Sequence, residues 1–539
     1  MYANAPEKGA NMIQGSMNGD TRRWRLLTGV ICLALPCGLI AVNCFLPFPD
    51  IVDFFGLGEL CLLMDADIKY CVNNNWGFAH PLSCWLLTKI TGDLLISQRI
   101  LNSLFIMISA TLLVRIVRYS RVRLSKASAG CLLLFVSSPW AAEAAVSVHL
   151  DIIPIAMTFI AVSLILSGKS FAASVAAGMA AGAAYWFRFH FLPMALLFPF
   201  LVAIVGKGRR HALFAAAGVL AAVAIPHILC LLAYGIFSIS NERFVLAHTL
   251  GAIDWSREAA VRASQMKISE IVRSFHPQQY LHAYAYQFIT SGIFPLTPIG
   301  AIALISYYLN HNKKTQIFFA GNTAERHIFA FALWAGIAII PFTLIRGFNL
   351  RLEAAFIFWV IPLAVSMVSN VSERMMKAIF VLLLLAMGVQ QARYWRYLYS
   401  DIPAMRAVER NVEKTIPEAV LKNSPESVIS CSRFYYNPHN KYRLCNPVIF
   451  IGWTASFEPF IERFGYLDLN RPFDNTIYKT ASYMILPTHP EGFTYSKELL
   501  TRNRTLFMDN YIIILRIIDH FPSPYSPSEL MSQTDSLAD

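Results

Sequence analysis

The carboxylates of residues 47–97 are the side chains with the clearest capacity for chemistry in this chain. Within the segment only Lys69 and Lys89 oppose them. The acids are Asp50, Asp53, Glu59, Asp65, Asp67 and Asp93. The surrounding sequence is strongly apolar, and in a membrane protein charged groups are costly unless they serve structure or function. The segment therefore predicts an acidic site on the outer face, such as an enzyme at the bilayer surface would use.

A second set of polar residues lies at the ends of apolar segments further along the chain. Asp151 begins one such segment. An ionisable residue at that depth indicates function, although an acid at a helix start also interacts favourably with the helix dipole. Arginine is suited to bidentate binding of a phosphate, and contact with lipid headgroups is the alternative. The other candidates for substrate binding at such ends are Arg188, His190, Arg346 and Arg351.

The composition is that of a polytopic membrane protein. Hydrophobic residues make up 56% of the chain and charged residues only 14%, and the mean hydropathy is +0.48. Soluble domains carry about 25% charged residues. The net charge of +12 does not indicate nucleic-acid binding, because the basic residues form short clusters between apolar runs.

Hydropathy predicts about eleven membrane-spanning helices within a module of residues 26–392. They are expected near 26–46, 98–117, 127–142, 150–167, 171–187, 190–205, 212–233, 291–308, 328–346, 352–369 and 377–392. Basic clusters gather on the cytoplasmic side of a membrane. A cytoplasmic N-terminus (1–25) satisfies this for every cluster and places 47–97 and a loop at 234–290 outside. Arg99 is expected to anchor the second span at the interface.

Within the first outer loop, Asp53–Val72 has the spacing of one helix lying in the membrane interface. Its apolar stripe is Phe54, Leu57, Leu60, Cys61, Met64, Ile68 and Cys71. Asp65 and Lys69 are expected to pair across one turn. Glu59 is a candidate for substrate binding, and the alternative is that Glu59, Asp65 and Asp67 form a solvated face. For Asp53 the alternative to chemistry is a helix N-cap.

The end of the chain has the composition of a small extracytoplasmic α/β domain (393–520) followed by a disordered tail (521–539). A helix is expected over Pro403–Lys414. Strands are expected over Ser427–Ser430, Val448–Trp453, Tyr483–Leu486 and Tyr511–Ile518. Cys431 and Cys445 flank a polar segment and are candidates for a disulfide outside the cytosol.

The order of these features resembles the GT-C superfamily of integral-membrane glycosyltransferases, which includes protein mannosyltransferases, aminoarabinose transferases and bacterial core-sugar transferases. The likeness is carried by DFFGLGELCLLMDADIKYCVNNNWGFAHPLSCWLLTKITGDLLISQR, SSPWAAEAAVSVHLD and GMAAGAAYWFRFHFLP, within about residues 26–205. Many relatives have an Asp-Glu pair followed by His-Pro-Pro-Leu. Here Asp53 and His80 stand at a similar spacing, but Phe54 replaces the Glu and Leu82 follows a single proline.

The resemblance implies an all-α polytopic fold and transfer of a sugar from a polyprenyl-phosphate donor, with inversion at the anomeric carbon. Asp53, favoured over Asp50 and Glu59 by its spacing, would orient or deprotonate the acceptor hydroxyl. His80 would bind substrate, and cationic groups would stabilise the departing lipid phosphate. The acceptor would be an envelope glycan, lipid or protein at the outer face of the cell (inner or plasma) membrane.

Two other functions compete with this reading, a transporter or flippase for lipid-linked sugars and a membrane scaffold. A transporter is expected to have repeated halves and polar groups near the midplane, whereas here the polar groups gather at one face. A scaffold has no need of clustered outer acids and arginines. No cofactor is predicted, and a divalent cation is left open. Asp65 and Asp67 are formally a DxD pair, but on a helix they would diverge by about 200°.

Overall fold

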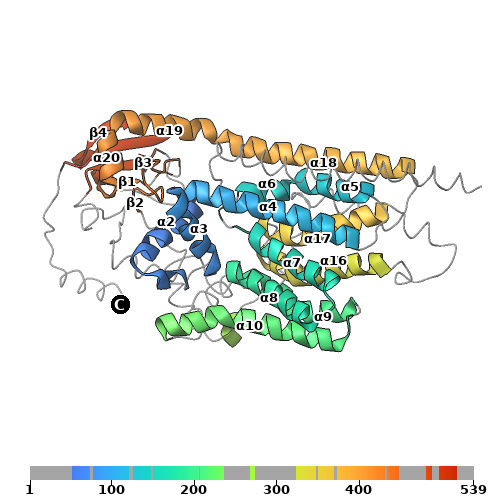
Figure 1. Cartoon of the computed structure of the whole chain (residues 1–539). Coiled ribbons are helices and arrows are strands. Elements are labelled where there is room, and N and C mark those ends of the chain that lie inside the picture. The colour runs from blue at the N-terminus through green and yellow to red at the C-terminus, as the bar shows by residue number, and fades with distance from the viewer. Residues whose placement is uncertain are drawn as a thin grey trace, which may run out of the picture.

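The computed structural model is mostly helical with one small sheet (Figure 1). It describes residues 51–72, 77–119, 125–146, 148, 150–205, 207–235, 268–273, 323–346, 350–368, 373–430, 432, 434–447, 481–488 and 497–518. The spans expected at 26–46 and 291–308 lie outside these ranges. So do the two termini and most of the loop 234–290, in which α13 (Ile268–Arg273) is described.

The first outer segment folds into two helices separated by a 3-10 turn. They are α2 (Ile51–Ala66), η1 (Ile68–Cys71) and α3 (Ala79–Thr91). Asp67 ends α2 because its backbone is extended and its carboxylate accepts a hydrogen bond from the Lys69 backbone N–H at 3.0 Å. The helix expected over Asp53–Val72 is therefore divided. The break also changes the register, so Lys69 pairs with Asp67 at 2.9 Å and the expected pair with Asp65 is wrong.

The apolar stripe predicted for this segment is buried, as a helix packed on other elements requires. Ile68 is the exception, at 52% exposed. The buried members are Phe54, Leu57, Leu60, Cys61, Met64 and Cys71. The stripe therefore contacts protein along most of its length instead of lying open to lipid headgroups.

The apolar segments from residue 94 to residue 234 form helices close to the predicted spans. They are α4 (Leu94–Tyr119), α5 (Ser125–Val136), α6 (Pro139–Val146), α7 (Ile152–Ser167), α8 (Phe171–Phe187), α9 (Leu192–Ile204) and α10 (Arg209–Tyr234). The span expected at 127–142 is two helices, because the chain turns at Ser138 before Pro139. The Ser138 hydroxyl accepts a hydrogen bond from the Ala141 backbone N–H at 3.2 Å and so begins α6.

Small residues let α8 and α10 approach each other closely. A Cβ added at Gly178 would collide with the backbone of Ala215, and one added at Gly218 would collide with the backbone of Val175. Such glycines and alanines are typical of helix packing where lipid supplies no hydrophobic driving force. The small residues of α8 thus serve helix packing.

Three further helices complete the described bundle. They are α16 (Thr323–Arg346), α17 (Leu350–Val368) and α18 (Glu373–Ser400). Aromatic rings join α16 and α17, with the centroids of Trp334 and Trp359 5.9 Å apart. The Tyr394 hydroxyl on α18 donates to the carboxylate of Glu143 on α6. α18 therefore crosses the bundle on the side of α5 and α6 and leads into the C-terminal domain (Figure 1).

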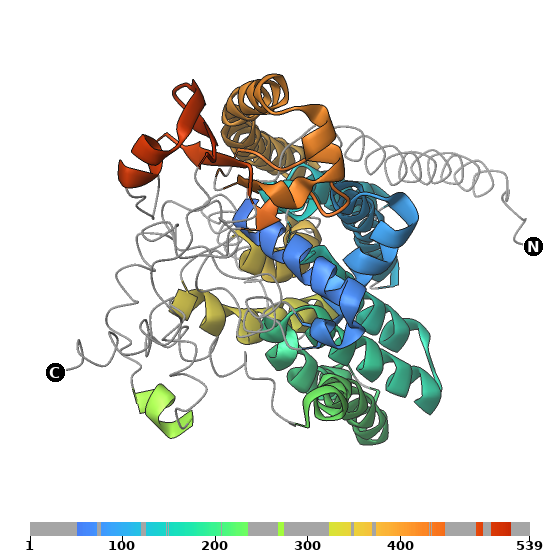
Figure 2. The same ribbon diagram turned by 90° about the vertical axis from the view of Figure 1, so that its left-hand side faces the viewer.

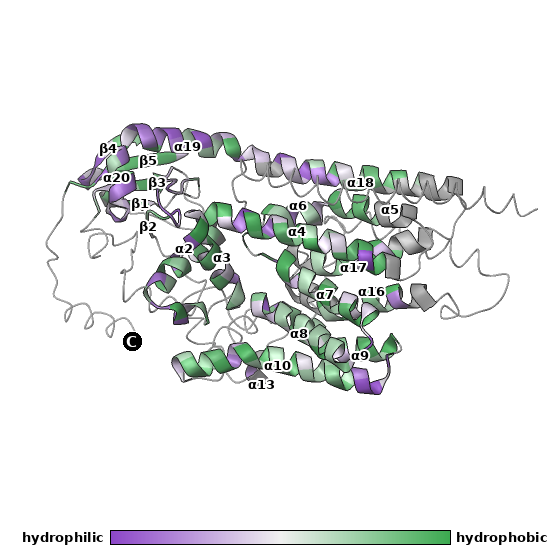
Figure 3. Cartoon of the chain, in the orientation of Figure 1, coloured by the Kyte–Doolittle hydropathy of each residue, from purple (hydrophilic) through white to green (hydrophobic). Residues whose placement is uncertain are grey.

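Large apolar side chains are also exposed on the outside of the bundle. Green, for hydrophobic residues, recurs along its helices in Figure 3. On α10 the exposed ones are Leu213, Phe214, Leu220, Ile228, Leu231 and Leu232. On α18 they are Val381, Leu382, Leu385 and Val389. Among the described helices, Leu94–Val117 and Arg209–Tyr234 are long and apolar enough to cross a bilayer.

The C-terminal domain is a five-stranded mixed sheet with helices packed on it. Its elements are α19 (Ile402–Thr415), α20 (Glu418–Asn423), η3 (Pro425–Ser427), β1 (Val428–Ser430), β2 (Asn446–Pro447), β3 (Tyr483–Pro487), α23 (Lys497–Arg502), β4 (Arg504–Met508) and β5 (Ile512–Arg516). The strand order is β2-β1-β3-β5-β4, with β1 parallel to both neighbours and the rest antiparallel.

The alternation along β5 explains why this sheet is covered on both faces. Ile512 and Ile514 pack with Val408 and Val412 of α19, whereas Ile513 and Leu515 pack with Leu499 of α23. Successive residues of a strand point to opposite faces, so one run of apolar residues serves two cores. The α/β character and three of the expected strands are confirmed, whereas β2 and β4 were not predicted. The expected strand Val448–Trp453 lies outside the described residues.

One end of the bundle carries the first outer segment and the C-terminal domain together (Figure 2). The Tyr234 hydroxyl, at the end of α10, donates to the Lys69 carbonyl of η1 at 3.1 Å, which brings α10 to this end. At the opposite end the Lys207 ammonium donates to the Gly168 carbonyl at 2.8 Å. This bond joins the link between α7 and α8 to the link between α9 and α10, and both links carry basic residues. The acidic segment and these basic links therefore lie at opposite ends, as the loop charges predict.

Candidate functional site

A buried ion pair at the end of the bundle joins two residues that the sequence singled out. The Nε of Arg188, at the end of α8, lies 2.7 Å from Oδ1 of Asp151, just before α7. Their side chains are only 11% and 5% exposed. Asp151 occupies the N-cap position, but its side chain makes no capping hydrogen bond there. Its carboxylate therefore binds a guanidinium, and its place at the start of α7 also keeps the favourable interaction with the helix dipole.

His80 lies beside this pair. It is the second residue of α3 and is completely buried. Burial, and then the positive charge of Arg188, lower the pKa of His80 well below its ordinary value, while the backbone of Val148 acts in the opposite direction. The Gln98 side-chain amide on α4 also donates to the Val148 carbonyl. Residues of α3, α4 and α8 therefore meet around one short stretch of chain before α7.

The backbone of that stretch is strained. Leu150, directly before Asp151, has a φ of 49°, in the left-handed region that few residues other than glycine adopt. Such conformations cost on the order of 1–3 kcal/mol and cluster at functional sites, where packing maintains them. Here the strained residue lies in the turn that leads into α7, directly before Asp151 at the start of that helix.

The start of α4 contributes polar residues that sequence reasoning missed. Its buried polar residues are Ser97, Gln98, Arg99, Asn102 and Ser103. The Asn102 amide donates to the Ala145 carbonyl of α6 at 3.1 Å. Arg99 was expected to anchor the span at the interface, but it is 1% exposed and its charge acts on the tyrosine Tyr436 of the C-terminal domain. The signal that could have found this group is five polar residues within seven positions of an apolar helix.

The helix α2 brings Asp53 to the same end, in its first turn. Because α2 begins at Ile51, Asp53 is inside the helix and not at its cap. Its side chain is outside the described part of the structure. The next residue, Phe54, packs edge-on against Tyr436 with ring centroids 6.0 Å apart. Asp53 is thus one residue from a contact with Tyr436 of the C-terminal domain, the tyrosine on which the charge of Arg99 acts.

Glu59 also departs from the solvated face considered for it. It is 4% exposed, and burial raises its pKa well above the ordinary value. The neighbouring Gly58 packs so closely on the C-terminal domain that an added Cβ would lie 2.7 Å from the Tyr442 carbonyl oxygen. Because Glu59 itself is buried, it stays a candidate for substrate binding or proton transfer.

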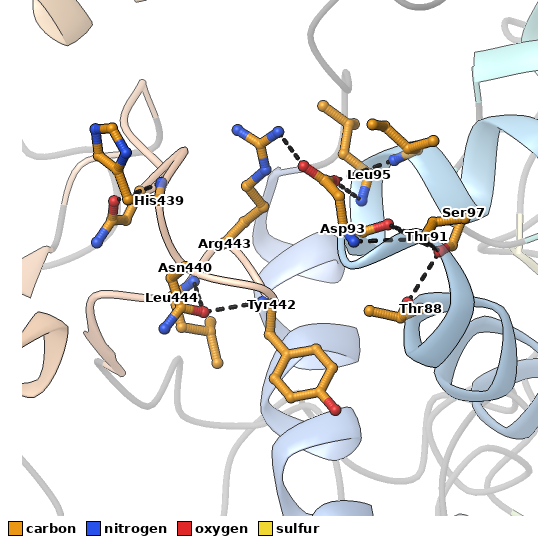
Figure 4. Close-up of polar contacts among 12 residues, drawn as sticks. Thr88, Thr91, Asp93, Leu95, Ser97, His439, Asn440, Tyr442, Arg443 and Leu444 are labelled. Carbon is orange, nitrogen blue, oxygen red and sulfur yellow. Dashed lines mark hydrogen bonds and ion pairs between the residues drawn. The ribbon is translucent and has the colours of Figure 1, made fainter. Parts of the chain in front are cut away.

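A loop of the C-terminal domain (437–444) docks on the turn between α3 and α4 (Figure 4). Arg443 forms an ion pair with Asp93, and the Leu94 backbone N–H donates to the Lys441 carbonyl at 3.0 Å. Asp93 also caps α4 by accepting from the Leu95 backbone N–H at 2.8 Å. The loop is held by Asn440, whose side-chain oxygen accepts from the Tyr442 backbone N–H at 2.9 Å. The domain thus fixes the start of the helix that carries the buried polar group.

Three other predicted site residues are placed by the elements that carry them. His190 lies in the turn η2 (Phe189–Phe191), two residues after Arg188. Arg346 ends α16 and Arg351 lies in the first turn of α17, but their side chains are outside the described residues. Cys445 is a buried free thiol and Cys431 is not described, so the proposed disulfide stays a prediction.

The carboxylates of the formal DxD pair have separate partners. Asp65 binds Lys89 and the indole nitrogen of Trp85, whereas Asp67 binds Lys69. Among the residues that the structure describes, no group of three or more His, Cys, Asp and Glu side chains could hold a metal ion.

Comparison with known proteins gives a structural likeness. No family model matches the chain, and no curated protein matches it. The chain is similar to ArnT. The crystal structure of ArnT from Cupriavidus metallidurans bound to undecaprenyl phosphate is 14% identical, with a TM-score of 0.46, over 94% of this chain and 99% of that chain. Its apo state gives a TM-score of 0.45 with the same identity and coverage.

ArnT is an aminoarabinose transferase, a glycosyltransferase of the GT-C superfamily that the sequence resembles. At this identity and these TM-scores the likeness to ArnT transfers no residue role, donor or acceptor to this chain. The function proposed below therefore rests on the residues around Arg188 and Asp151.

Proposed function

We propose that the chain is a multi-pass membrane glycosyltransferase that moves a sugar from a polyprenyl-phosphate donor to an acceptor hydroxyl, with inversion. The observation that carries this is the buried Arg188 guanidinium, fixed at one end of the bundle by Asp151. The ion pair uses Nε, and the two terminal nitrogens are not part of that bond. A guanidinium held in this way is suited to an anionic phosphate oxygen.

The reaction requires an oriented acceptor hydroxyl and stabilisation of the negative charge on the departing lipid phosphate. The acceptor oxygen would form a bond to the anomeric carbon while the bond between that carbon and the phosphate oxygen breaks. The electron pair leaves with the lipid phosphate, whose charge Arg188 stabilises. The proton of the acceptor hydroxyl passes to Asp53, a transfer typically worth about 10²–10⁴-fold in rate. Arg346 and Arg351 would add positive charge, because the link between α16 and α17 is expected on the same face.

The membrane setting is part of the proposal. The apolar outer surfaces of α10 and α18 support burial in lipid, where a polyprenyl chain also lies. We assign the protein to the cell (inner or plasma) membrane with the site and the C-terminal domain outside the cytoplasm. The acceptor is an envelope glycan, lipid or protein.

Transfer of radiolabelled sugar tests this proposal. Membranes containing the chain would be supplied with polyprenyl-phosphate hexose or pentose, and label in the envelope fraction would be followed. Arg188→Gln should abolish transfer, whereas Arg209→Gln, an exposed arginine at the opposite end, should preserve it. Equal activity of Arg188→Gln and the unchanged protein would refute the role of this guanidinium.

A further inference from the structure

Two lysines share one carboxylate where the C-terminal domain meets α3. Lys89 of α3 binds Oδ1 of Asp65, and Nζ of Lys441 lies 3.8 Å from Oδ2 of the same side chain. The three side chains are between 31% and 40% exposed. The junction therefore presents two ammonium groups to solvent against a single negative charge.

The surroundings of Lys441 act against its positive charge. Burial, and then the neighbouring Lys89 side chain, lower the pKa of Lys441, and the Asp65 carboxylate acts in the opposite direction. Like charges repel at this range, so an anion placed between them would be stabilised. Lys69 offers a contrast nearby, since it pairs one-to-one with Asp67.

The surface around Lys89 has the character of a membrane interface. Leu86 and Ile90, on the same exposed side of α3, are 51% and 82% exposed. The Trp85 indole lies beneath the Lys89 ammonium, 4.9 Å from Nζ to the ring centroid. Tryptophan and lysine beside exposed apolar residues are typical of helices at the level of lipid headgroups. An anion bound here would therefore be carried by a lipid whose chains contact Leu86 and Ile90.

We propose that Lys89 and Lys441 form a binding site for the phosphate of an anionic lipid, assembled when the loop 437–444 docks on α3. This site is separate from Arg188 and goes beyond transferase activity, although it rests on the membrane setting proposed above. Because one lysine comes from each part, a bound lipid would tie the C-terminal domain to the membrane surface.

Native mass spectrometry of the purified full chain in detergent tests this inference. Phosphatidylglycerol is the probe, with zwitterionic phosphatidylethanolamine and inorganic phosphate as comparisons. The double variant Lys89→Gln/Lys441→Gln should bind phosphatidylglycerol about thirtyfold more weakly, as two lysines at about 1 kcal/mol each imply. Lys69→Gln should bind as the unchanged protein does. Lys89→Arg/Lys441→Arg should retain binding, which separates loss of charge from loss of structure.

Two results would overturn the inference. One is equal affinity of the unchanged protein and the double glutamine variant for phosphatidylglycerol. The other is lysine-dependent binding of inorganic phosphate as tight as that of the lipid, which would make the ligand a soluble anion. Neither depends on sugar transfer, and Arg188→Gln should leave this binding unchanged, so failure here is distinguishable from failure of the transferase proposal.

Discussion

Arg188 and Asp151 are 37 residues apart in the chain, yet they form an ion pair of 2.7 Å between Nε and Oδ1. α7 and α8 run in opposite directions, so the start of one and the end of the other meet at the same end of the bundle. Asp151 holds the guanidinium in one orientation, which lowers the entropic cost of binding an anion. The pair is therefore both a structural contact and the support for a phosphate site.

Asp151→Asn should destabilise the protein and weaken donor binding. Removing one partner of a buried ion pair costs about 3–5 kcal/mol, because the remaining charge is left uncompensated. Thermal unfolding in detergent would measure the first effect, and binding of a polyprenyl phosphate would measure the second. Asp67→Asn is the control, since its pair with Lys69 is exposed and worth little.

A charge reversal separates the two roles of the pair. Asp151→Arg/Arg188→Asp should regain part of the thermal stability lost by either single change, yet remain unable to bind the donor. Recovery of donor binding by this double variant would show that Arg188 acts only as a structural partner.

Acid should destabilise the protein through His80. Its pKa is lowered in the folded state, so below about pH 6.5 the unfolded chain binds a proton that the folded chain does not. Stability then falls as pH falls, by up to about 1.4 kcal/mol per pH unit, and is constant above that range. The melting temperature between pH 5 and pH 8 measures this. His80→Gln should flatten the acid side of the curve, and an unchanged slope would assign it to other groups.

Breaking the ion pair of Arg443 with Asp93 should loosen the C-terminal domain without unfolding it. Arg443→Ala removes one contact of the docked loop while the sheet keeps its own core. Limited proteolysis should cut the variant faster near the loop. Arg443→Lys should restore protection. Equal protease resistance of Arg443→Ala and the unchanged protein would show that this ion pair does not hold the loop in place.

Asp53→Asn should abolish transfer and leave expression, membrane insertion and donor binding intact. The reason is that the proposed base acts on the acceptor proton and not on the lipid phosphate. Initial rates with saturating donor would measure the effect. Normal turnover by this variant would remove Asp53 from the mechanism and direct attention to Glu59.

Much of the helical framework is predictable from sequence, because apolar runs of spanning length leave few alternatives. α8 begins and ends where the hydropathy places it, at Phe171 and Phe187. The failures have local causes. Asp67 caps the next turn and so divides the outer helix, and Ser138 with Pro139 divides a span into two helices. Both are side-chain effects that a hydropathy average does not register.

The site was harder to predict than the framework, because its partners are distant in sequence. Asp151, Arg188 and His80 were candidates by residue type and by their place at the ends of apolar segments. The contact of Arg188 with Asp151 and the effect of its charge on His80 depend on how three helices pack. Arg99 was misjudged as an interface anchor, although the run of polar residues at the start of α4 is a signal for a buried polar group. The junction of Lys89 with Lys441 joins segments some 350 residues apart, as does the neighbouring pair of Arg443 with Asp93.

The most direct test of the account is the affinity of the purified protein for a polyprenyl phosphate, compared between the unchanged chain, Arg188→Gln and Arg209→Gln. The account predicts a loss of at least about tenfold for Arg188→Gln, corresponding to one charge-assisted contact of about 1.4 kcal/mol or more, and no change for Arg209→Gln. Equal affinity of all three proteins would contradict it.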